Sequence, residues 1–184
     1  TQVQSKIGLN FASALRAILR QDPDVIMIGE ISDLETAQIA VQASLTGHLV
    51  LATLHTNDSI SAIVRLIDMG IEPYLLASTL NGVLAQRLVR KICYLCSNSA
   101  TKIPSCENCS YSGFKGRTGI YEFFQVNDEI RGLIKDTSDL KILRYAAKKS
   151  GMSSLFQEGA RLVNEKITSI EEINRVTSLS EEQV

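Results

Sequence analysis

The sequence predicts an α/β fold that is joined to a cysteine-containing module and a helical lobe. Two runs, residues 24–30 and 47–56, each contain a continuous apolar stretch with the composition of a parallel strand that is buried on both faces. A helical pattern precedes each run, and the order helix, strand, helix, strand is that of a right-handed crossover unit with a parallel sheet. All four cysteines then fall between residues 88 and 126, and the pattern after Asn127 is helical again.

Capping and breaking residues bound the helices of the α/β part. Asn10 is a suitable cap for the first helix, and Asp22-Pro23-Asp24 stops it. Ser32 or Asp33 caps the second helix, which Gly47 ends. The predicted helices of this part are 10–21, 33–45, 59–69 and a helix that runs from residue 73 towards residue 87.

The second half of the chain contains an irregular region followed by a helical region. Prolines and glycines interrupt residues 88–126 and leave short strand-like pieces at 88–92 and 119–126. Helical segments are predicted after them at 128–135, 138–150, 154–165 and 170–176. The predicted domains are therefore an α/β part at 1–88, a cysteine module at 89–126 and a helical subdomain at 127–184.

Composition argues against two classes of partner. The net charge of −1 gives no bulk attraction to nucleic acid or to a membrane surface, and the absence of tryptophan disfavours an aromatic platform for stacking bases. No stretch has the length of a membrane span and no signal peptide opens the chain. A start without methionine is consistent with a piece of a longer protein.

The four cysteines form two knuckles, Cys93-x2-Cys96 and Cys106-x2-Cys109. Each knuckle can supply two thiolates to a tetrahedral Zn²⁺, so the set predicts a closed, structural zinc site. Two disulfides or four unrelated core thiols are the alternatives. Disulfides are rare in intracellular proteins, which is the location expected of a chain without a signal peptide. We expect metal removal to unfold residues 88–126 first.

Polar side chains follow both apolar runs. Glu30 ends the first, and Thr53 and His55 end the second. Ligand groups collect at the carboxyl ends of parallel strands, so these side chains are predicted to meet at one edge of the sheet. A carboxylate there can activate water for attack on a phosphate or help to hold Mg²⁺. The alternatives are a salt-bridged glutamate and a hydrogen-bonded structural histidine, and for His48 the structural role is preferred.

The chain does not contain the glycine-rich run ending in Gly-Lys-Ser/Thr that cradles phosphates in P-loop enzymes. The phosphate loop must therefore lie upstream, or the protein does not hydrolyse nucleotides. A non-hydrolytic docking module, built from the cysteine module and the helical lobe, is the alternative function.

Several stretches together resemble one family, the secretion ATPase superfamily, whose members power type II secretion and type IV pilus assembly and retraction. The stretches in the α/β part are residues 15–24, 28–31, 33–37, 46–48 and 53–57. Residues 84–90, followed by the cysteines, resemble the secretion and pilus-extension branch, because the retraction branch usually lacks the zinc module. Residues 116–122 and 170–177 agree with this branch.

The resemblance implies a partial RecA-like P-loop ATPase domain. It implies a cytoplasmic homo-hexamer, peripheral at the inner membrane, that couples ATP hydrolysis to pseudopilus or pilus assembly through a platform protein and other secretion components. No nucleic acid is expected as a partner. The phosphate loop lies upstream in the family, so this chain is expected to be the C-terminal portion of the protein and to be inactive by itself.

The resemblance also assigns site residues. Glu30 matches the glutamate of an atypical Walker B motif, in which Gly29 stands where many P-loop enzymes have a magnesium-organising aspartate. His48, Thr53 and His55 match the histidine box. Catalysis is thus expected from Glu30 and His55, and contacts to ATP and Mg²⁺ from Gly29, Thr53 and His48.

Two features depart from the family pattern. Ser32 stands where the family usually has arginine, which removes a cation from the edge of the site. The two knuckles are also closer together than in many relatives, which puts any partner contact of the intervening loop in doubt.

Overall fold

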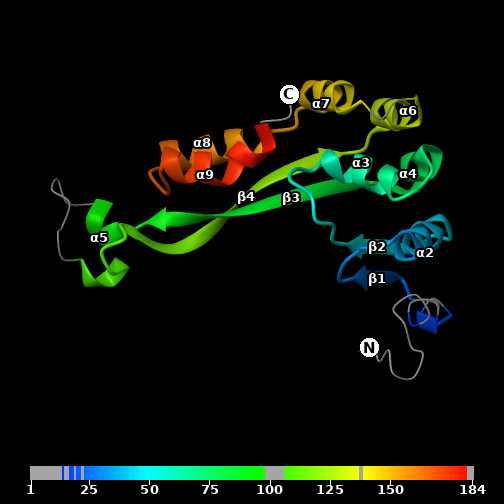
Figure 1. The fold of residues 1–184 in the computed structure, drawn as a ribbon, viewed down its shortest axis with the longest axis horizontal. Coiled ribbons are helices and arrows are strands. Elements are labelled where there is room, and N and C mark those ends of the chain that lie inside the picture. The colour runs from blue at the N-terminus through cyan, green and yellow to red at the C-terminus, as the bar shows by residue number, and fades with distance from the viewer. Residues whose placement is uncertain are drawn as a thin grey trace. The chain divides into compact units, whose positions relative to one another are not determined.

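The computed structural model describes residues 14, 17–18, 20–21, 23–97, 106–136 and 139–181, with side chains described as far as residue 177 (Figure 1). The described chain forms two compact units. The first takes in residues up to Thr56 together with Ile60–Gly82 and Gln125–Ala146, and the second takes in Asn57–Ser59, Val83–Phe124 and the chain from Ala147. The predicted first helix, residues 10–21, lies mostly outside the described residues.

The first unit contains the predicted crossover. Strands β1 (Val25–Ile28) and β2 (Leu49–Ala52) pair in parallel, with Val25 opposite Leu49 and Ile28 opposite Ala52. Helix α2 (Leu34–Leu45) connects them. The prediction of a strand, a helix and a parallel strand is confirmed, and the carboxyl ends of β1 and β2 lie at the same edge.

One face of this sheet is exposed among the described residues. Ile26 and Ile28 are buried, whereas Met27 is 80% exposed and Leu49 and Leu51 are about half exposed, at 49% and 48%. The prediction that both strands are buried on both faces is therefore wrong for the part of the chain that the structure describes. Helix α2 contributes small buried side chains to one face, and the exposed side chains show that no described residue covers the other.

The ends of α2 follow from its flanking residues. Asp33 accepts hydrogen bonds from the backbone N–H of Thr36 at 2.8 Å and from the Thr36 hydroxyl at 3.0 Å. These bonds satisfy a free donor of the first turn and lower the pKa of the Asp33 carboxyl. At the other end, Gly47 adopts a φ of +97°, which few side chains tolerate, and the helix stops as predicted.

The remaining helices of the first unit pack on one another. Helices α3 (Ser61–Asp68) and α4 (Pro73–Thr79) follow β2, and α4 packs against α2 and α6 (Asp128–Asp136). Arg131 of α6 donates to the carbonyl of Ala77 and, at 3.4 Å, to Asn81 Oδ1. These bonds tie α6 to the end of α4.

The chain after α4 corrects one predicted element. Residues up to Arg87 were expected to continue the helix, but α4 ends at Thr79 and strand β3 (Gly82–Ile92) begins three residues later. Residues 84–87 are good helix formers, but Asn81 and Gly82 before them are poor ones, and pairing with β4 (Phe114–Gln125) makes the stretch a strand. The predicted piece at 88–92 is the last part of β3, and the predicted piece at 119–126 corresponds to the second half of β4, which ends at Gln125.

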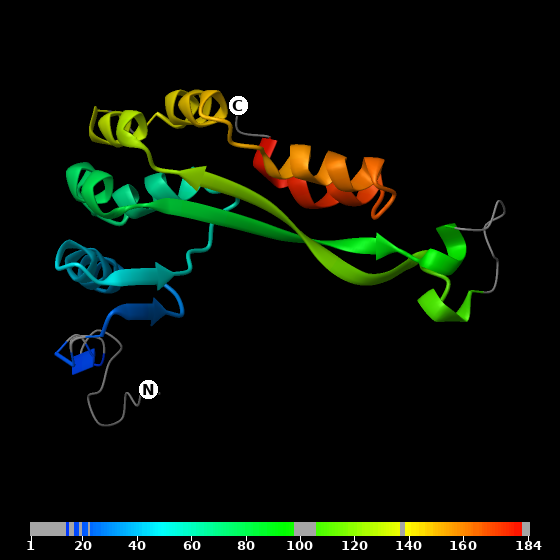
Figure 2. The same cartoon turned by 180° about the vertical axis from the view of Figure 1, so that it is seen from behind.

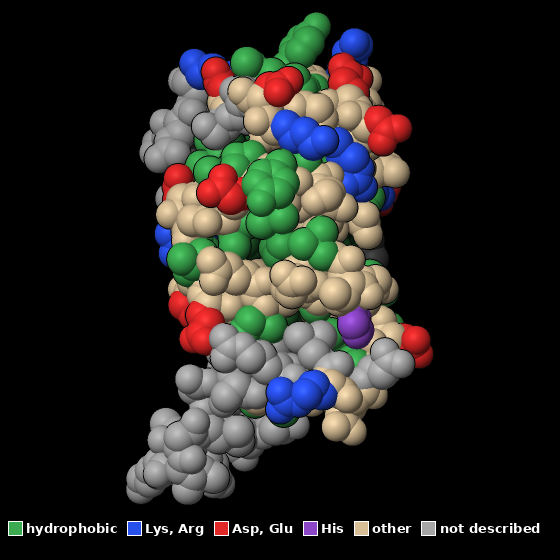
Figure 3. Space-filling view, turned by 90° about the vertical axis from the view of Figure 1, so that its right-hand side faces the viewer, with side chains coloured by type: hydrophobic (Ala, Val, Ile, Leu, Met, Phe, Trp, Pro, Cys, Tyr) green, Lys and Arg blue, Asp and Glu red, His purple; other side chains and the backbone are tan. Residues whose placement is uncertain are grey.

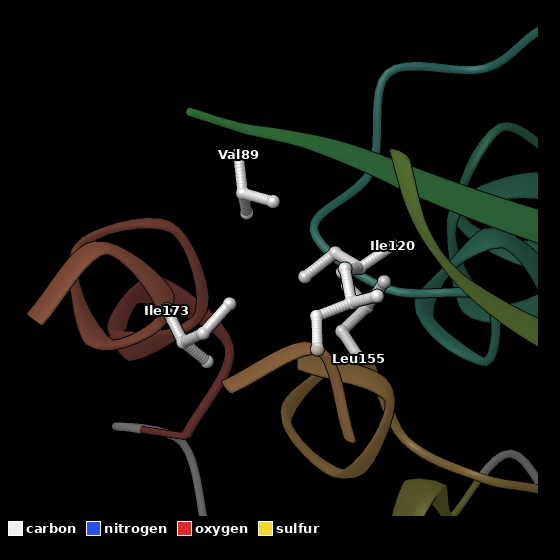
Figure 4. Close-up of a cluster of buried hydrophobic side chains, with 5 residues drawn as sticks. Val89, Ile120, Leu155 and Ile173 are labelled. Carbon is white, nitrogen blue, oxygen red and sulfur yellow. The ribbon is translucent and has the colours of Figure 1, made fainter. Parts of the chain in front are cut away.

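Strands β3 and β4 form the frame of the second unit. They run in opposite directions and twist about each other, with α8 (Leu155–Asn164) and α9 (Ile170–Glu181) along one side (Figures 1 and 2). The buried side chains that fill the space between the strands and the helices are Val89, Ile120, Leu155, Leu162 and Ile173 (Figure 4). A Cβ on Gly159 would lie 2.7 Å from Ile173, so the absence of a side chain lets α8 and α9 pack closely.

A buried ion-pair cluster fastens α9 to β3. The Glu172 side chain is fully buried, and its oxygens accept from the Arg90 guanidinium at 2.7 and 3.0 Å and from Arg175 at the same distances. The backbone N–H of Arg90 donates a further bond at 3.0 Å. The Arg90 guanidinium also lies 4.3 Å from the centre of the Phe114 ring. Because Arg175 and Arg90 stabilise the carboxylate, the pKa of Glu172 lies well below its usual value of 4.5.

We expect Glu172→Gln to lower the free energy of unfolding by about 2 kcal/mol, since charge-assisted hydrogen bonds are lost. The folded-state pKa is depressed, so the contribution of Glu172 is fully present above the unfolded-state pKa near 4.5 and is lost progressively as the pH falls from there towards the folded-state pKa. Urea unfolding should therefore show that the free energy of unfolding falls less between pH 7 and pH 3 in the variant than in the wild type. The control is Glu72→Gln, which makes the same chemical change at an exposed position before α4. Equal losses of unfolding free energy for Glu172→Gln and the wild type would contradict this account.

The helical prediction for the end of the chain is confirmed by α6, α7 (Leu140–Lys149), α8 and α9. The three-part domain division stays a prediction, and the two compact units follow other boundaries: β3, β4, α8 and α9 share one unit, while α6 belongs to the other. No described helix has both the length and the apolar character that crossing a bilayer requires.

Candidate functional site

The edge at the carboxyl ends of β1 and β2 brings four predicted site residues together. The Thr53 hydroxyl donates to the Gly29 carbonyl, and the Ile31 N–H donates to the Thr53 carbonyl at 2.9 Å. Glu30 Oε1 lies 3.4 Å from His55 Nε2. The segment after each strand is thereby held to the other, and the two chemically active side chains face one another.

Both groups of this pair are open to solvent. The Glu30 side chain is 49% exposed and the His55 side chain is 88% exposed. A carboxylate in this position can hold a water molecule and accept a proton from it, and an imidazole can donate to an anion. The arrangement therefore suits attack by water on an anionic group placed against this edge.

The structure places His48 elsewhere. Its Nδ1 lies 3.0 Å from the Ala43 carbonyl oxygen and 3.1 Å from the Thr46 hydroxyl, at the end of α2 and the start of β2. This is the opposite end of β2 from Thr53, so His48 is not at the edge that holds the other site residues. Its contacts fit the structural alternative.

Sequence reasoning missed a buried carboxylate that anchors the segment after His55. The Glu122 side chain on β4 accepts hydrogen bonds from the Ser59 hydroxyl and, at 2.9 Å, from the Ser59 N–H; both residues are buried. Arg87 on β3 donates to the Asn57 carbonyl at 3.2 Å. The sequence signal for it was the alternation of inward- and outward-facing positions along β4, where Glu122 lies between the apolar inward-facing residues Ile120 and Phe124.

The four cysteines form the second candidate site. Their sulfur atoms all lie within 4.8 Å of one another, with Cys93 and Cys106 3.8 Å apart and Cys96 and Cys109 3.7 Å apart. Disulfide sulfurs are bonded at about 2.0 Å, so these are free thiols. A tetrahedral Zn²⁺ with bonds of about 2.3 Å separates its sulfur ligands by about 3.8 Å. The observed spacing therefore fits a tetrahedral four-thiolate site.

The turns around the cysteines shape this cluster. The first knuckle follows β3 and includes α5 (Tyr94–Ser97), and the second includes the 3₁₀ turn η2 (Glu107–Cys109). The Cys93 N–H donates to the Gly113 carbonyl at 2.8 Å, which joins the two ends of the module. The predicted tight connection through Pro104 lies outside the described residues.

The thiols of the first knuckle differ in acidity. The side-chain amide of Asn108, whose Nδ2 lies 3.3 Å from Cys93 Sγ, is the main reason that the pKa of Cys93 is lowered to about 6. The contact with Cys106, together with burial, raises the pKa of Cys96 to about 12. Of these two thiols, Cys93 therefore loses its proton more readily than Cys96.

One face of the molecule carries charged side chains of both signs. On the face that Figure 3 shows, acidic and basic side chains are interspersed with hydrophobic ones rather than gathered in one basic area. This agrees with the net charge of −1.

Comparison with known proteins identifies relatives along nearly the whole chain. The family model for type II/IV secretion system proteins matches residues 1–175. The type II secretion system protein HxcR of Pseudomonas aeruginosa is 58% identical over 179 residues, which cover 96% of this chain and 38% of HxcR. The type II secretion system ATPase E of Vibrio cholerae is 47% identical, over 98% of this chain and 40% of the relative. The type IV pilus assembly ATPase TfpB of Acinetobacter baylyi is 44% identical, over 97% of this chain and 34% of TfpB.

Solved structures show the same α/β ATPase fold. The pilus retraction motor PilT with bound ADP superposes with a TM-score of 0.71 and 33% identity, over 91% of this chain and 43% of PilT. The ATPase DotB of Yersinia pseudotuberculosis superposes with a TM-score of 0.72 and 25% identity, over 93% of this chain and 41% of DotB. The chain thus spans about two-fifths of the length of such relatives, and it belongs to the type II/IV secretion system protein family, within the secretion ATPase superfamily.

Proposed function

We propose that this chain is the C-terminal part of an ATPase motor that drives pseudopilus assembly in type II secretion or pilus assembly in a type IV pilus system. The observation that carries the proposal is the Glu30–His55 pair, 3.4 Å apart at the carboxyl edge of β1 and β2. Relatives named as type II secretion and type IV pilus assembly ATPases support it.

In the proposed reaction, Glu30 positions the attacking water and takes its proton. His55 contacts the terminal phosphate from the facing strand, and Thr53 fixes the Gly29 carbonyl and with it the path of the chain beside Glu30. Bound Mg²⁺ would neutralise charge on the phosphates. One protein carboxylate suits this ion, because Mg²⁺ on nucleotides is usually held by one or two carboxylates and the phosphates themselves.

The cysteine module is proposed to hold one structural Zn²⁺ through Cys93, Cys96, Cys106 and Cys109. All four sulfurs would be ligands, so the ion would have no open position for a substrate. Its function would be to fold the tip of the β3–β4 hairpin.

The full-length protein is proposed to act as a cytoplasmic homo-hexamer that docks on an inner-membrane platform protein. The names of the relatives place those proteins in type II secretion systems, and the oligomeric state, the location and the platform protein are part of this proposal. The 184-residue chain by itself is expected to show no turnover, because it has no glycine-rich phosphate loop.

Steady-state phosphate release by the full-length protein tests the proposal. With zinc, Mg²⁺, ATP and the platform protein present, we expect turnover that stops when Mg²⁺ is omitted. Without any turnover under these conditions, the motor is excluded and the docking module becomes the better account. Turnover by the isolated 184-residue chain would contradict the expected need for an upstream phosphate loop.

A further inference from the structure

Asn108 connects the two cysteine knuckles through its side chain. It lies between Cys106 and Cys109 in the turn η2, on the second knuckle. Its Nδ2 lies 3.3 Å from the sulfur of Cys93, which belongs to the first knuckle. The amide therefore reaches across the four-sulfur cluster, and it joins segments that are 15 residues apart in the sequence.

The chemistry of the two groups sets the direction of this bond. A thiolate can only accept hydrogen bonds, so the amide must present its NH₂ group to the sulfur. A sulfur bound to zinc still carries negative charge, and a donor at 3.3 Å stabilises that charge and restricts where the sulfur can lie. Partners of this kind commonly orient metal ligands from outside the ligand set.

Burial makes the amide hard to replace at this sulfur. Cys93 is fully buried, whereas Cys96 is partly exposed. Water can donate to the sulfur of Cys96, but it has no such access to Cys93. Loss of the Asn108 amide would therefore leave the Cys93 sulfur without this donor and with no solvent to take its place.

We propose that Asn108 is a positioning residue of the metal site, whose side-chain amide donates to the zinc-bound sulfur of Cys93 and thereby slows the release of zinc. The inference rests on the structural zinc proposed above. It adds a residue that holds a ligand in place without being a ligand.

The test measures zinc release from the full-length protein. Zinc content is determined first by elemental analysis, and the rate of transfer to an excess of a coloured chelator is then followed. We expect one zinc per chain in the wild type and in Asn108→Ala, with release from the variant on the order of 10-fold faster or more. Asn108→Asp has nearly the same shape but places a carboxylate beside the thiolate, so its release should be at least as fast. The exposed neighbour variant Glu107→Gln is the control and should release zinc at the wild-type rate.

A spectroscopic measurement separates this role from general loosening of the fold. In protein loaded with Co²⁺ instead of zinc, sulfur-to-metal charge-transfer bands report the electron density on the thiolates. Loss of a donor to Cys93 should shift these bands to lower energy in Asn108→Ala and leave them unchanged in Glu107→Gln.

The outcomes test the zinc site and the role of Asn108 separately. If the wild type binds no zinc, the zinc site is wrong and the role of Asn108 falls with it. If every variant holds one zinc and Asn108→Ala matches the wild type in release rate and Co²⁺ spectrum, the zinc site stands and the role of Asn108 is wrong.

Discussion

Replacing Glu30 by glutamine in the full-length protein should lower kcat for ATP hydrolysis on the order of 100-fold or more, as the loss of a general base typically does. Glutamine preserves the size of the side chain but cannot take a proton from the attacking water. Glu30 is about half exposed, so the change removes no buried contact, and the fold and the affinity for ATP should be maintained. Steady-state phosphate release at saturating ATP measures the effect.

The matched control is Glu72→Gln, which makes the same chemical change at an exposed position before α4. It should leave kcat within about 2-fold of the wild type, since surface substitutions away from special features have small effects. A Glu30→Gln variant with wild-type kcat would remove Glu30 from the chemistry and leave its contact with His55 as a surface interaction.

Metal removal should unfold the tip of the hairpin. Structural zinc commonly supplies the free energy that folds its module. The described residues in question are 93–97 and 106–113, which have a small cluster of their own around the cysteines. Strands β3 and β4 should remain folded, because Val89 and Ile120 pack against α8 and α9. This narrows the sequence-based expectation that all of residues 88–126 unfold first.

Hydrogen exchange before and after stringent chelation tests this prediction. Backbone amides of the two knuckles, including the Cys93 N–H bonded to Gly113, should lose protection, while amides of α8 and α9 provide an internal control. Cys93→Ser should reproduce the loss without chelation, because it removes one of the four ligands. Unchanged protection of the knuckles, in protein shown to be free of metal, would mean that zinc does not fold the module.

The crossover and its polar edge were predictable because each rests on local signals. Asp33 and Gly47 bound α2 by capping chemistry, and apolar runs mark β1 and β2. Parallel pairing then places the residues after each strand at one edge, which is how Glu30 and His55 come together. The cysteine cluster was equally accessible, because two Cys-x2-Cys knuckles leave few ways to arrange four thiols.

The parts that sequence reasoning missed depend on residues far apart in the chain. Residues 83–88 favour a helix locally, and only pairing with β4 makes them a strand. Glu172 resembles any acidic residue in a first helical turn until Arg90 is brought to it from 82 residues away. The resemblance assigns His48 to the site together with Thr53 and His55. His48 precedes β2, however, whereas Thr53 and His55 follow it, so His48 lies at the opposite end of the strand.

The most direct test of the central claim follows a single turnover of ATP bound to the full-length protein. The proposed edge predicts that wild-type protein converts bound ATP to ADP, whereas Glu30→Gln binds ATP with similar affinity and retains it unhydrolysed. Conversion by Glu30→Gln at the wild-type rate would contradict the assignment of the β1–β2 edge as the site of hydrolysis.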